Sequence, residues 1–324
     1  MTPRERGSKA AGRQYFRPYP GGPLLEKERK VKHRQIKEQR RGGTKRRKAV
    51  VESTALDTRP YENRIYCGDA ERVLQRFPDQ FVDIIVTSPP YNFGQAYASE
   101  TLDVDDAVRW DRYFMQLKRV WCECVRVLKP GGRFCVNVQP LFSDYVPTHH
   151  VVSTQLRELG LLWKAEFLWE KHNYSCKYTA WGSWKSPSMP YIKYTWEFIE
   201  VFCKETHRKE ETHRKAGEPS KIDITGDEFK DWVYAKWEVA PEGRMKRYGH
   251  PAMFPEALPY RLLKLFSYVD DLVLDPFNGV GTTTLVAEKL GRRWIGVDVS
   301  ATYCQTAKRR IQTYRAQRKR GAGT

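Results

Sequence analysis

The stretch that decides the fold is Asp275-Pro276-Phe277-Asn278-Gly279-Val280-Gly281-Thr282-Thr283. It follows the apolar run DLVLD at 271–275 and opens an amphipathic stretch at 282–290. Glycines between a strand and a helix let a ligand approach the backbone at the helix N-terminus. Some 17 residues past Gly281, Asp298 ends the next apolar run, where a carboxylate can bind paired ribose hydroxyls. We therefore predict a nucleoside site here.

The glycine pair differs from the pattern of a dinucleotide-binding dehydrogenase. That pattern, GxGxxG, would place a third glycine where the chain has Thr284. By itself, a glycine pair often only makes a turn, and an aspartate at a strand end often only caps a helix. The loop must therefore be interpreted together with the rest of the chain.

Short apolar runs alternate with amphipathic stretches along the chain. Seven runs have the composition of buried parallel strands, at 65–67, 82–87, 133–138, 164–170, 196–202, 271–275 and 293–298. Helical stretches are expected at 110–128, 151–159, 255–268, 282–290 and 300–315, with Thr282 and Ser300 as helix starters. The alternation predicts an α/β fold with a doubly wound, seven-stranded, mostly parallel Rossmann-like sheet.

A second motif, Ser88-Pro89-Pro90-Tyr91, directly follows the run at 82–87. Active-site loops of open α/β sheets lie at such carboxyl ends of strands. Two prolines fix φ and remove two backbone donors, so we expect the carbonyls of Ser88 and Pro89 to point outward and accept an amino group's hydrogens. Tyr91 offers an aromatic face to an extracted base, worth about 1 to 3 kcal/mol. The four residues of the turn are the candidate catalytic residues.

The turn and the glycine loop together resemble the amino-methyltransferases of DNA, in which an SPPY, DPPY or NPPY turn accompanies a DPFxGxGTT loop. The resemblance covers most of residues 61–316 and includes Cys67-Gly68-Asp69, Leu128-Lys129-Pro130-Gly131-Gly132 and His250-Pro251-Ala252-Met253-Phe254-Pro255. It implies S-adenosylmethionine as the cofactor and no metal. The residues implied to bind the cofactor are Asp69, His250, Phe254, Asp275, Phe277, Gly279, Gly281, Thr282, Thr283 and Asp298.

The order of the two motifs resembles the circularly permuted group of this family, called beta, because the catalytic turn precedes the cofactor loop. The resemblance then implies that the last two strands lie centrally in the sheet. Two departures concern the cofactor pocket. Phe254 stands where some members have a lysine, so the cofactor carboxylate needs another partner, and Gly279-Val280-Gly281 replaces the commoner Gly-Ser-Gly.

Five parts are predicted along the chain. They are a basic flexible arm at 1–59, the catalytic half of the methyltransferase domain at 60–170, a target-recognition region at 171–248, the cofactor-binding half at 249–316 and a basic tail at 317–324. The target-recognition region contains an inserted loop at 204–220, in which the sequence ETHRK occurs twice. We expect this loop to be exposed because it holds almost no apolar residue.

Both ends of the chain are strongly basic. The net charge is +18, of which residues 1–59 contribute 18 bases against 6 acids and residues 301–324 contribute seven bases and no acid. Residues 60–300 are left with a net charge of −1. We expect both ends to contact phosphates without reading sequence, with solvated tails as the alternative.

The target-recognition region mixes aromatic rings with basic side chains, which suits phosphates and splayed nucleotides. Residues 196–202 alternate like a core strand and are expected to be buried instead. The candidate DNA-binding residues are Lys171, Lys177, Tyr178, Trp181, Trp184, Lys185 and Lys193.

Within the family, the serine form of the turn resembles enzymes acting on the N4 amino group of cytosine, and the aspartate form those acting on N6 of adenine. We therefore expect a site-specific cytosine-N4 DNA methyltransferase, with the adenine enzyme as the alternative. An RNA methyltransferase and a non-catalytic nucleic-acid-binding protein are further alternatives. The implied partner is double-stranded DNA with the target base flipped out; a cognate restriction endonuclease and a homodimer stay open.

Seven cysteines form no CxxC pair, which indicates a reducing compartment and argues against a structural zinc. The chain holds no run of about eighteen apolar residues and no apolar signal segment. We expect a cytoplasmic, nucleoid-associated protein without a membrane partner.

Overall fold

The structure of the 324-residue chain is a computed structural model. It describes residues 60–90, 110–140, 146–172, 187–188, 192, 194–211, 221–243 and 245–321. The chain divides into two compact units, residues 1–55 and 56–324, and every described residue belongs to the second. The predicted basic arm at 1–59 lies outside the described residues.

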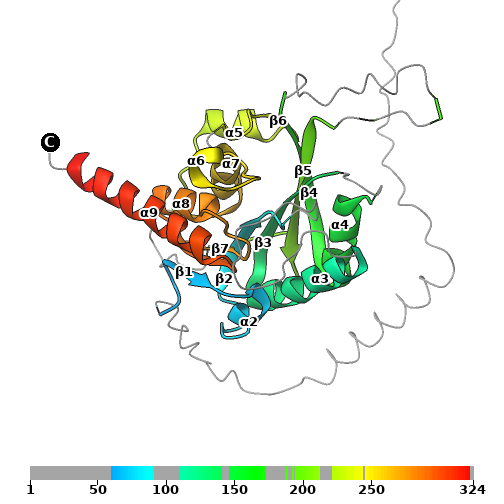
Figure 1. Ribbon diagram of the computed structural model, residues 1–324, viewed down its shortest axis with the longest axis horizontal. Helices are drawn as coiled ribbons and strands as arrows, with labels where there is room; N and C mark the ends of the chain where they lie inside the picture. Colours follow the sequence, from blue (N-terminus) through cyan, green and yellow to red (C-terminus); the bar gives the residue numbers. More distant parts are fainter. Residues whose placement is uncertain are drawn as a thin grey trace, which may run out of the picture. The chain divides into compact units, whose positions relative to one another are not determined.

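The second unit is built around one eight-stranded sheet (Figure 1). Its strands are β1 (Arg64–Cys67), β2 (Val82–Thr87), β3 (Leu128–Val138), β4 (Leu161–Glu170), β5 (Trp196–Lys204), β6 (Lys236–Glu238), β7 (Leu272–Asp275) and β8 (Arg293–Asp298). They are ordered β1-β8-β7-β2-β3-β5-β4-β6. The last two strands of the chain therefore lie between β1 and β2, which confirms the permuted order and the mostly parallel sheet.

Two features of the sheet differ from the sequence prediction. Strand β5 was expected to be parallel, but it runs antiparallel to both neighbours, with Val136 opposite Glu200 and Phe167 opposite Ile199. The apolar pattern of a buried strand reports burial on both faces and carries no information on direction. The structure also adds an eighth strand, β6, whose three residues are too short to give a periodic pattern.

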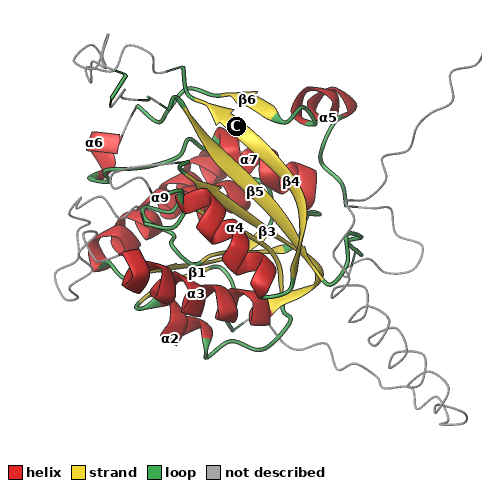
Figure 2. Ribbon diagram, turned by 90° about the vertical axis from the view of Figure 1, so that its right-hand side faces the viewer, coloured by secondary structure: helices red, strands yellow, loops and turns green. Residues whose placement is uncertain are grey.

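Helices cover both faces of the sheet. The helices α2 (Ala70–Leu74), α3 (Trp110–Val127) and α4 (Thr148–Glu158) pack on one face, where Figure 2 shows α3 and α4 side by side. On the other face pack α5 (Gly226–Trp232), α7 (Ala257–Phe266), α8 (Thr282–Lys289) and α9 (Ala301–Gly321). The short helix α6 (Met245–Tyr248) joins a small cluster with Met253, Val280 and Tyr303. The sheet is therefore doubly wound, as predicted.

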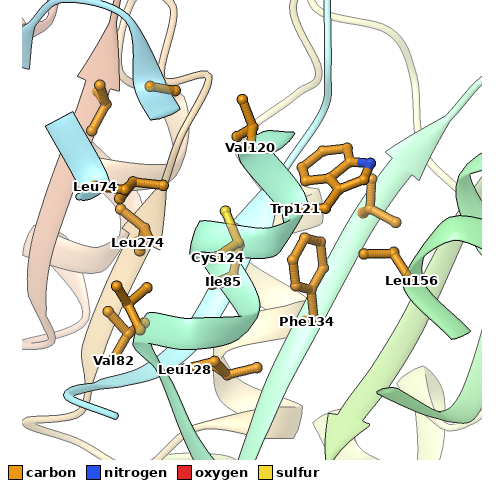
Figure 3. Packing of buried hydrophobic residues seen from close by; sticks show 14 of the residues in the cluster. Leu74, Val82, Ile85, Val120, Trp121, Cys124, Leu128, Phe134, Leu156 and Leu274 are labelled. Carbon is orange, nitrogen blue, oxygen red and sulfur yellow. The ribbon is translucent and has the colours of Figure 1, made fainter. Parts of the chain in front are cut away.

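The core beside the predicted catalytic turn is built on α3 (Figure 3). Its buried positions include Val120, Trp121 and Cys124, whose spacing gives one apolar stripe along the helix. The Trp121 ring is fully buried and meets Phe134 of β3 edge to face, with centroids 5.4 Å apart. Burial of such rings contributes strongly to core stability, so α3 is held firmly against β2 and β3.

The two predicted helix starters behave differently. Ser300 caps α9, since its hydroxyl accepts a hydrogen bond from the Tyr303 amide at 3.3 Å. Helix α8 does begin at Thr282, but the residue before it, Gly281, occupies the N-cap in a left-handed conformation, with φ +81°. Glycine adopts that conformation without the steric strain of a side chain.

The inserted loop at 204–220 is exposed only in part. Residues 205–208 are exposed as predicted, whereas the Lys209 ammonium lies at the amino ends of β2 and β7. It contacts the Asp271 carboxylate at 3.2 Å and the Asp83 carbonyl at 3.2 Å. A methyl group on Gly131 would meet the Arg208 carbonyl at 2.6 Å, so the loop packs against the beginning of β3. Residues 212–220 lie outside the described residues.

Among the described helices, none combines the length and apolar character that crossing a membrane requires. Six cysteines are described, and all six have free thiols.

Candidate active site

The predicted cofactor loop joins β7 to α8 and lies tightly against β8. The Asn278 amide donates to the Val297 carbonyl at 2.8 Å, and the Asn278 side chain accepts from the Thr284 hydroxyl at 2.9 Å. A methyl group on Gly296 would come within 2.6 Å of the Asn278 side chain. The loop is therefore held by its own side chains and by the strand beside it.

Asp298 at the end of β8 holds this loop through both carboxylate oxygens. Oδ2 accepts from the Gly279 amide at 2.7 Å, and Oδ1 accepts from the Ser300 amide at 2.8 Å. Burial raises the pKa of this carboxyl, and the two amide hydrogen bonds act against that rise. A carboxylate oxygen has further lone pairs, so Asp298 can also receive hydroxyl groups of a ligand.

Asp69 directly follows the backbone contact between the ends of β1 and β8. The Gly68 amide donates to the Asp298 carbonyl at 2.9 Å, which joins the end of β1 to the end of β8. Asp69 itself is exposed and caps α2 by accepting from the Arg72 amide at 3.0 Å. Two acidic side chains and the glycine loop thus meet at the carboxyl ends of three adjacent strands.

Asp275 is buried and connects the two predicted motifs. Its Oδ1 accepts from the Thr87 hydroxyl at 2.7 Å and from the Phe277 amide at 3.0 Å. Thr87 immediately precedes the Ser88 turn, so the catalytic turn and the cofactor loop begin at neighbouring strand ends. Burial raises the pKa of Asp275 to about 6, against the effect of these hydrogen bonds.

His250 brings the segment at 250–255 against the cofactor loop. A methyl group on Gly279 would come within 2.9 Å of His250 Nε2, and the His250 ring lies 4.7 Å from the Tyr303 ring. Burial lowers the pKa of His250 to about 4, so its ring is neutral at pH 7. Its Nδ1 accepts from the Ala252 amide at 3.2 Å, which leaves the proton on Nε2.

The remaining predicted cofactor residues line the same region or support it. Phe277 is half-buried and meets Trp121 edge to face, with centroids 5.7 Å apart. Thr283 is fully buried and donates to the Val86 carbonyl at 3.3 Å, so its hydroxyl ties α8 to β2. Thr282 is buried, and Phe254 is half-buried against the core under α7.

The predicted catalytic turn is fixed at two points in the described chain. The Ser88 hydroxyl donates to the Asn137 carbonyl at the end of β3, at 3.0 Å, and the Tyr113 hydroxyl donates to the Pro90 carbonyl at 2.8 Å. Pro89 is buried between them. Tyr91, the predicted stacking ring, lies outside the described residues. Sequence reasoning missed Tyr113, because an aromatic residue in the first turns of a core helix carries no local signal of its target.

Among the candidate DNA-binding residues, the structure describes only Lys171. Its ammonium pairs with the buried carboxylate of Glu197, and its amide donates to the Thr195 carbonyl at 2.8 Å. Lys177, Tyr178, Trp181, Trp184, Lys185 and Lys193 lie outside the described residues. Glu197 was also missed by sequence reasoning, although a glutamate inside the apolar run at 196–202 was a visible signal.

Comparison with known proteins agrees with this geometry. Residues 82–309 match the N6/N4 DNA methylase family. The Type II methyltransferase M.MjaI of Methanocaldococcus jannaschii is 30% identical over 275 residues, covering 73% of this chain and 87% of that protein. M.HpaI of Haemophilus parainfluenzae is 24% identical over 257 residues, covering 78% and 75% of the two chains.

A solved structure shares the fold. The protein TTHA0409 of Thermus thermophilus, described as a DNA modification methylase and solved with S-adenosyl-L-methionine, superimposes with a TM-score of 0.58. The two proteins are 30% identical, and the match covers 76% of this chain and 92% of that one. The chain therefore belongs to the DNA amino-methyltransferases that act on N4 or N6 groups and use S-adenosylmethionine.

The residues at the strand ends fit this cofactor. Carboxylates at the ends of β1 and β8 suit its amino and hydroxyl groups, and the half-buried Phe277 ring, which follows β7, adds an apolar surface. Glycine is needed at 279 and 281 even without a cofactor, because a side chain at these left-handed positions would meet His250 and Ala307, respectively.

Proposed function

We propose that this protein methylates the N4 amino group of cytosine at a specific sequence of double-stranded DNA, with the target base flipped into the site. The observation that carries the proposal is the hydrogen bond from the Ser88 hydroxyl to the Asn137 carbonyl. Because the hydroxyl hydrogen is directed at that carbonyl, the Ser88 oxygen acts as an acceptor toward an amino group.

An exocyclic amino nitrogen is a poor nucleophile, because its lone pair is delocalised into the ring. Acceptors that hold its two hydrogens favour the pyramidal form without a strong base. In our proposal the Ser88 hydroxyl oxygen, in place of the Ser88 carbonyl expected from the sequence, and the Pro89 carbonyl supply such acceptors in a turn that prolines keep rigid. As the new nitrogen–carbon bond forms, the bond between the methyl group and the donor sulfur breaks, which leaves a neutral thioether. The nitrogen then loses one proton, which passes from its hydrogen bonds with Ser88 and Pro89 to solvent.

S-adenosylmethionine supplies the methyl group as an electrophile on a sulfonium sulfur. In our proposal Asp298 binds its ribose hydroxyls and Asp69 its adenine amino group, and the loop from Asp275 to Thr283 holds the rest of the cofactor. Positioning of the two reactants accounts for much of the rate, since well-oriented groups can supply about 7 to 11 kcal/mol of the barrier.

Serine in the first position of the turn supports cytosine over adenine. A serine hydroxyl is a smaller and neutral acceptor, whereas the aspartate of the adenine form carries a charge. The six candidate DNA-binding residues between 173 and 193 belong to the segment that leaves β4 and returns to β5 at the same edge of the sheet as Ser88. Such a position suits a segment that reads the sequence around the target base.

Nucleoside analysis of DNA methylated in vitro tests the proposal directly. We expect N4-methylcytosine in the digest; N6-methyladenine would instead assign the adenine reaction. Tyr91→Ala should lose turnover far more than cofactor binding, since its ring is expected to stack on the base. Normal methylation by Tyr91→Ala at saturating DNA would remove the stacked-base mechanism.

A further inference from the structure

A buried carboxylate lies between the catalytic turn and the segment predicted to read DNA. Glu197, the second residue of β5, is only 3% exposed. Its carboxylate receives the ammonium of Lys171, the side-chain amide of Asn137 and, at 3.0 Å, the side-chain amide of Gln139. A buried charge is tolerated only when it is paired and hydrogen-bonded, so these contacts specify one arrangement of three strands.

This cluster touches the catalytic turn through Asn137. The Asn137 side chain donates to Glu197, and its main-chain carbonyl accepts the Ser88 hydroxyl at 3.0 Å. One residue therefore contacts both the catalytic turn and the buried carboxylate. A change in the position of Glu197 would move the atom that directs the Ser88 hydroxyl.

The same carboxylate binds the residue at which the predicted target-reading segment leaves β4. Lys171 is the first residue after β4, and it is bound to Glu197 through its side chain and to Thr195 through its amide, at 2.8 Å. The segment between them thus leaves and re-enters the sheet at a fixed point. This point lies beside the turn, because β5 pairs with β3 up to Val138.

We propose that Glu197 is a positioning residue that couples the target-reading segment to the catalytic turn. The inference rests on the proposed function, in that Ser88 must be the acceptor for the target amino group. Because Glu197 contacts both Lys171 and Asn137, it fixes the position of the target-reading segment relative to Ser88. The recognised sequence and the reacting nitrogen therefore keep a constant spacing. Misplacement of about 1 Å can lower a rate about a hundredfold, so a fixed connection here bears directly on turnover.

The test is the substitution Glu197→Gln in the full-length protein. It keeps the shape and one acceptor but removes the charge that holds Lys171. We expect the single-turnover methylation rate, at saturating DNA and cofactor, to fall at least about tenfold, or about 1.4 kcal/mol of transition-state stabilisation. Cofactor affinity should stay within about twofold, since the residues proposed to bind the cofactor lie at or after the ends of β1, β7 and β8 or between α6 and α7.

Two further variants separate positioning from folding. Glu197→Gln combined with Lys171→Met removes both charges, so it should regain thermal stability without regaining the rate. Glu200→Gln is the matched control on the same strand, because Glu200 is also 3% exposed but bonds Ser153 of α4. Burial raises the pKa of Glu200 to about 7, so the neutral variant should keep the wild-type rate.

A rate unchanged in Glu197→Gln, or one that recovers together with stability in the double variant, would overturn the positioning role. Tyr91→Ala measured in parallel distinguishes this failure from that of the proposed function. An inactive Tyr91→Ala with a fully active Glu197→Gln would refute only the coupling. A fully active Tyr91→Ala would refute the stacked-base mechanism of the proposed function.

Discussion

At the scale of single residues, two aspartates at neighbouring strand ends have different tasks. Asp298 is half-buried, and each of its oxygens accepts a backbone amide of the loop or of the start of α9. Asp275 is 2% exposed, and its partners include the Thr87 hydroxyl and the Phe277 amide. Asp298 is therefore the proposed ligand-binding carboxylate, whereas Asp275 joins the two motifs through Thr87 and Phe277.

Replacing Asp298 by alanine should weaken S-adenosylmethionine binding at least about tenfold. The substitution removes the proposed ribose contact and also leaves the Gly279 amide without its acceptor, so the loop loses its fixed position. Isothermal titration calorimetry on the folded variant measures the affinity. Unchanged affinity would show that the ribose contact is assigned to the wrong residue.

Replacing Asp275 by asparagine should stabilise the protein at neutral pH. Its pKa of about 6 lies above the ordinary value of 3.8, so the folded state holds this proton more tightly than the unfolded state. The stability that the protonated Asp275 side chain contributes is present below about pH 4 and is lost as pH rises through about 6. The variant should gain up to about 3 kcal/mol at pH 7.

Denaturant unfolding of Asp275→Asn between pH 4 and pH 7, without added cofactor, checks this sign. The two stability curves should converge at the acid end, because the protonated aspartate resembles asparagine. A variant less stable than wild type at pH 7 would mean that the ionised carboxylate is favoured there.

At the scale of elements, the cofactor loop is shaped by the helix packed on it. Gly281 has φ +81°, and a methyl group there would come within 2.7 Å of the Ala307 side chain of α9. Gly291, between α8 and β8, has φ +68°, but its nearest atom would be 3.7 Å away, on Val269. The two glycines share a backbone conformation and differ in the space beside them.

Alanine at Gly281 should therefore destabilise the protein more than alanine at Gly291. Left-handed backbone costs an alanine about 1 to 2 kcal/mol at either position, and overpacking adds about 1 to 3 kcal/mol at Gly281 alone. Thermal unfolding of both variants gives the comparison. Equal losses at the two positions would show that α9 moves aside without cost.

At the scale of the whole chain, the basic residues are concentrated at the two ends. Within the described tail of α9, Lys319 and Arg320 are exposed, whereas Arg315 pairs with Glu288 at 2.8 Å and Arg310 with Glu256 at 3.2 Å. The charge of residues 1–59 is a net +12, against −1 for residues 60–300. We therefore expect the first 59 residues to be the larger source of nonspecific attraction to phosphates.

Deleting residues 1–59 should weaken DNA binding on all sequences and leave the methylated sequence unchanged. Log affinity falls with log salt by about 0.9 per phosphate neutralised, so the truncated protein should show a shallower salt slope. Removing only residues 317–324, with three bases, should change the slope less. A full slope after the first deletion would mean that residues 1–59 contact no phosphate.

Much of the architecture follows from local sequence. All seven predicted strands and all five helical stretches are present, because apolar periodicity records which side of a segment faces the core. The resemblance of the two motifs to a permuted family also predicted the interior place of β7 and β8. Both motifs lie in short turns at strand ends. The geometry of such a turn depends on the few residues within it, so a local sequence pattern can indicate it.

The tertiary structure alone decided the contacts between distant residues. Thr87 and Asp275 are 188 positions apart, and Asn137 and Glu197 are 60 apart, so no local pattern records either pair. The reversed direction of β5 and the ion pair of Lys209 with Asp271 likewise depend on contacts that no local pattern records. Periodicity in the sequence determines how deeply a residue is buried, but its partner depends on how the strands are ordered, and that order forms only when the whole sheet assembles.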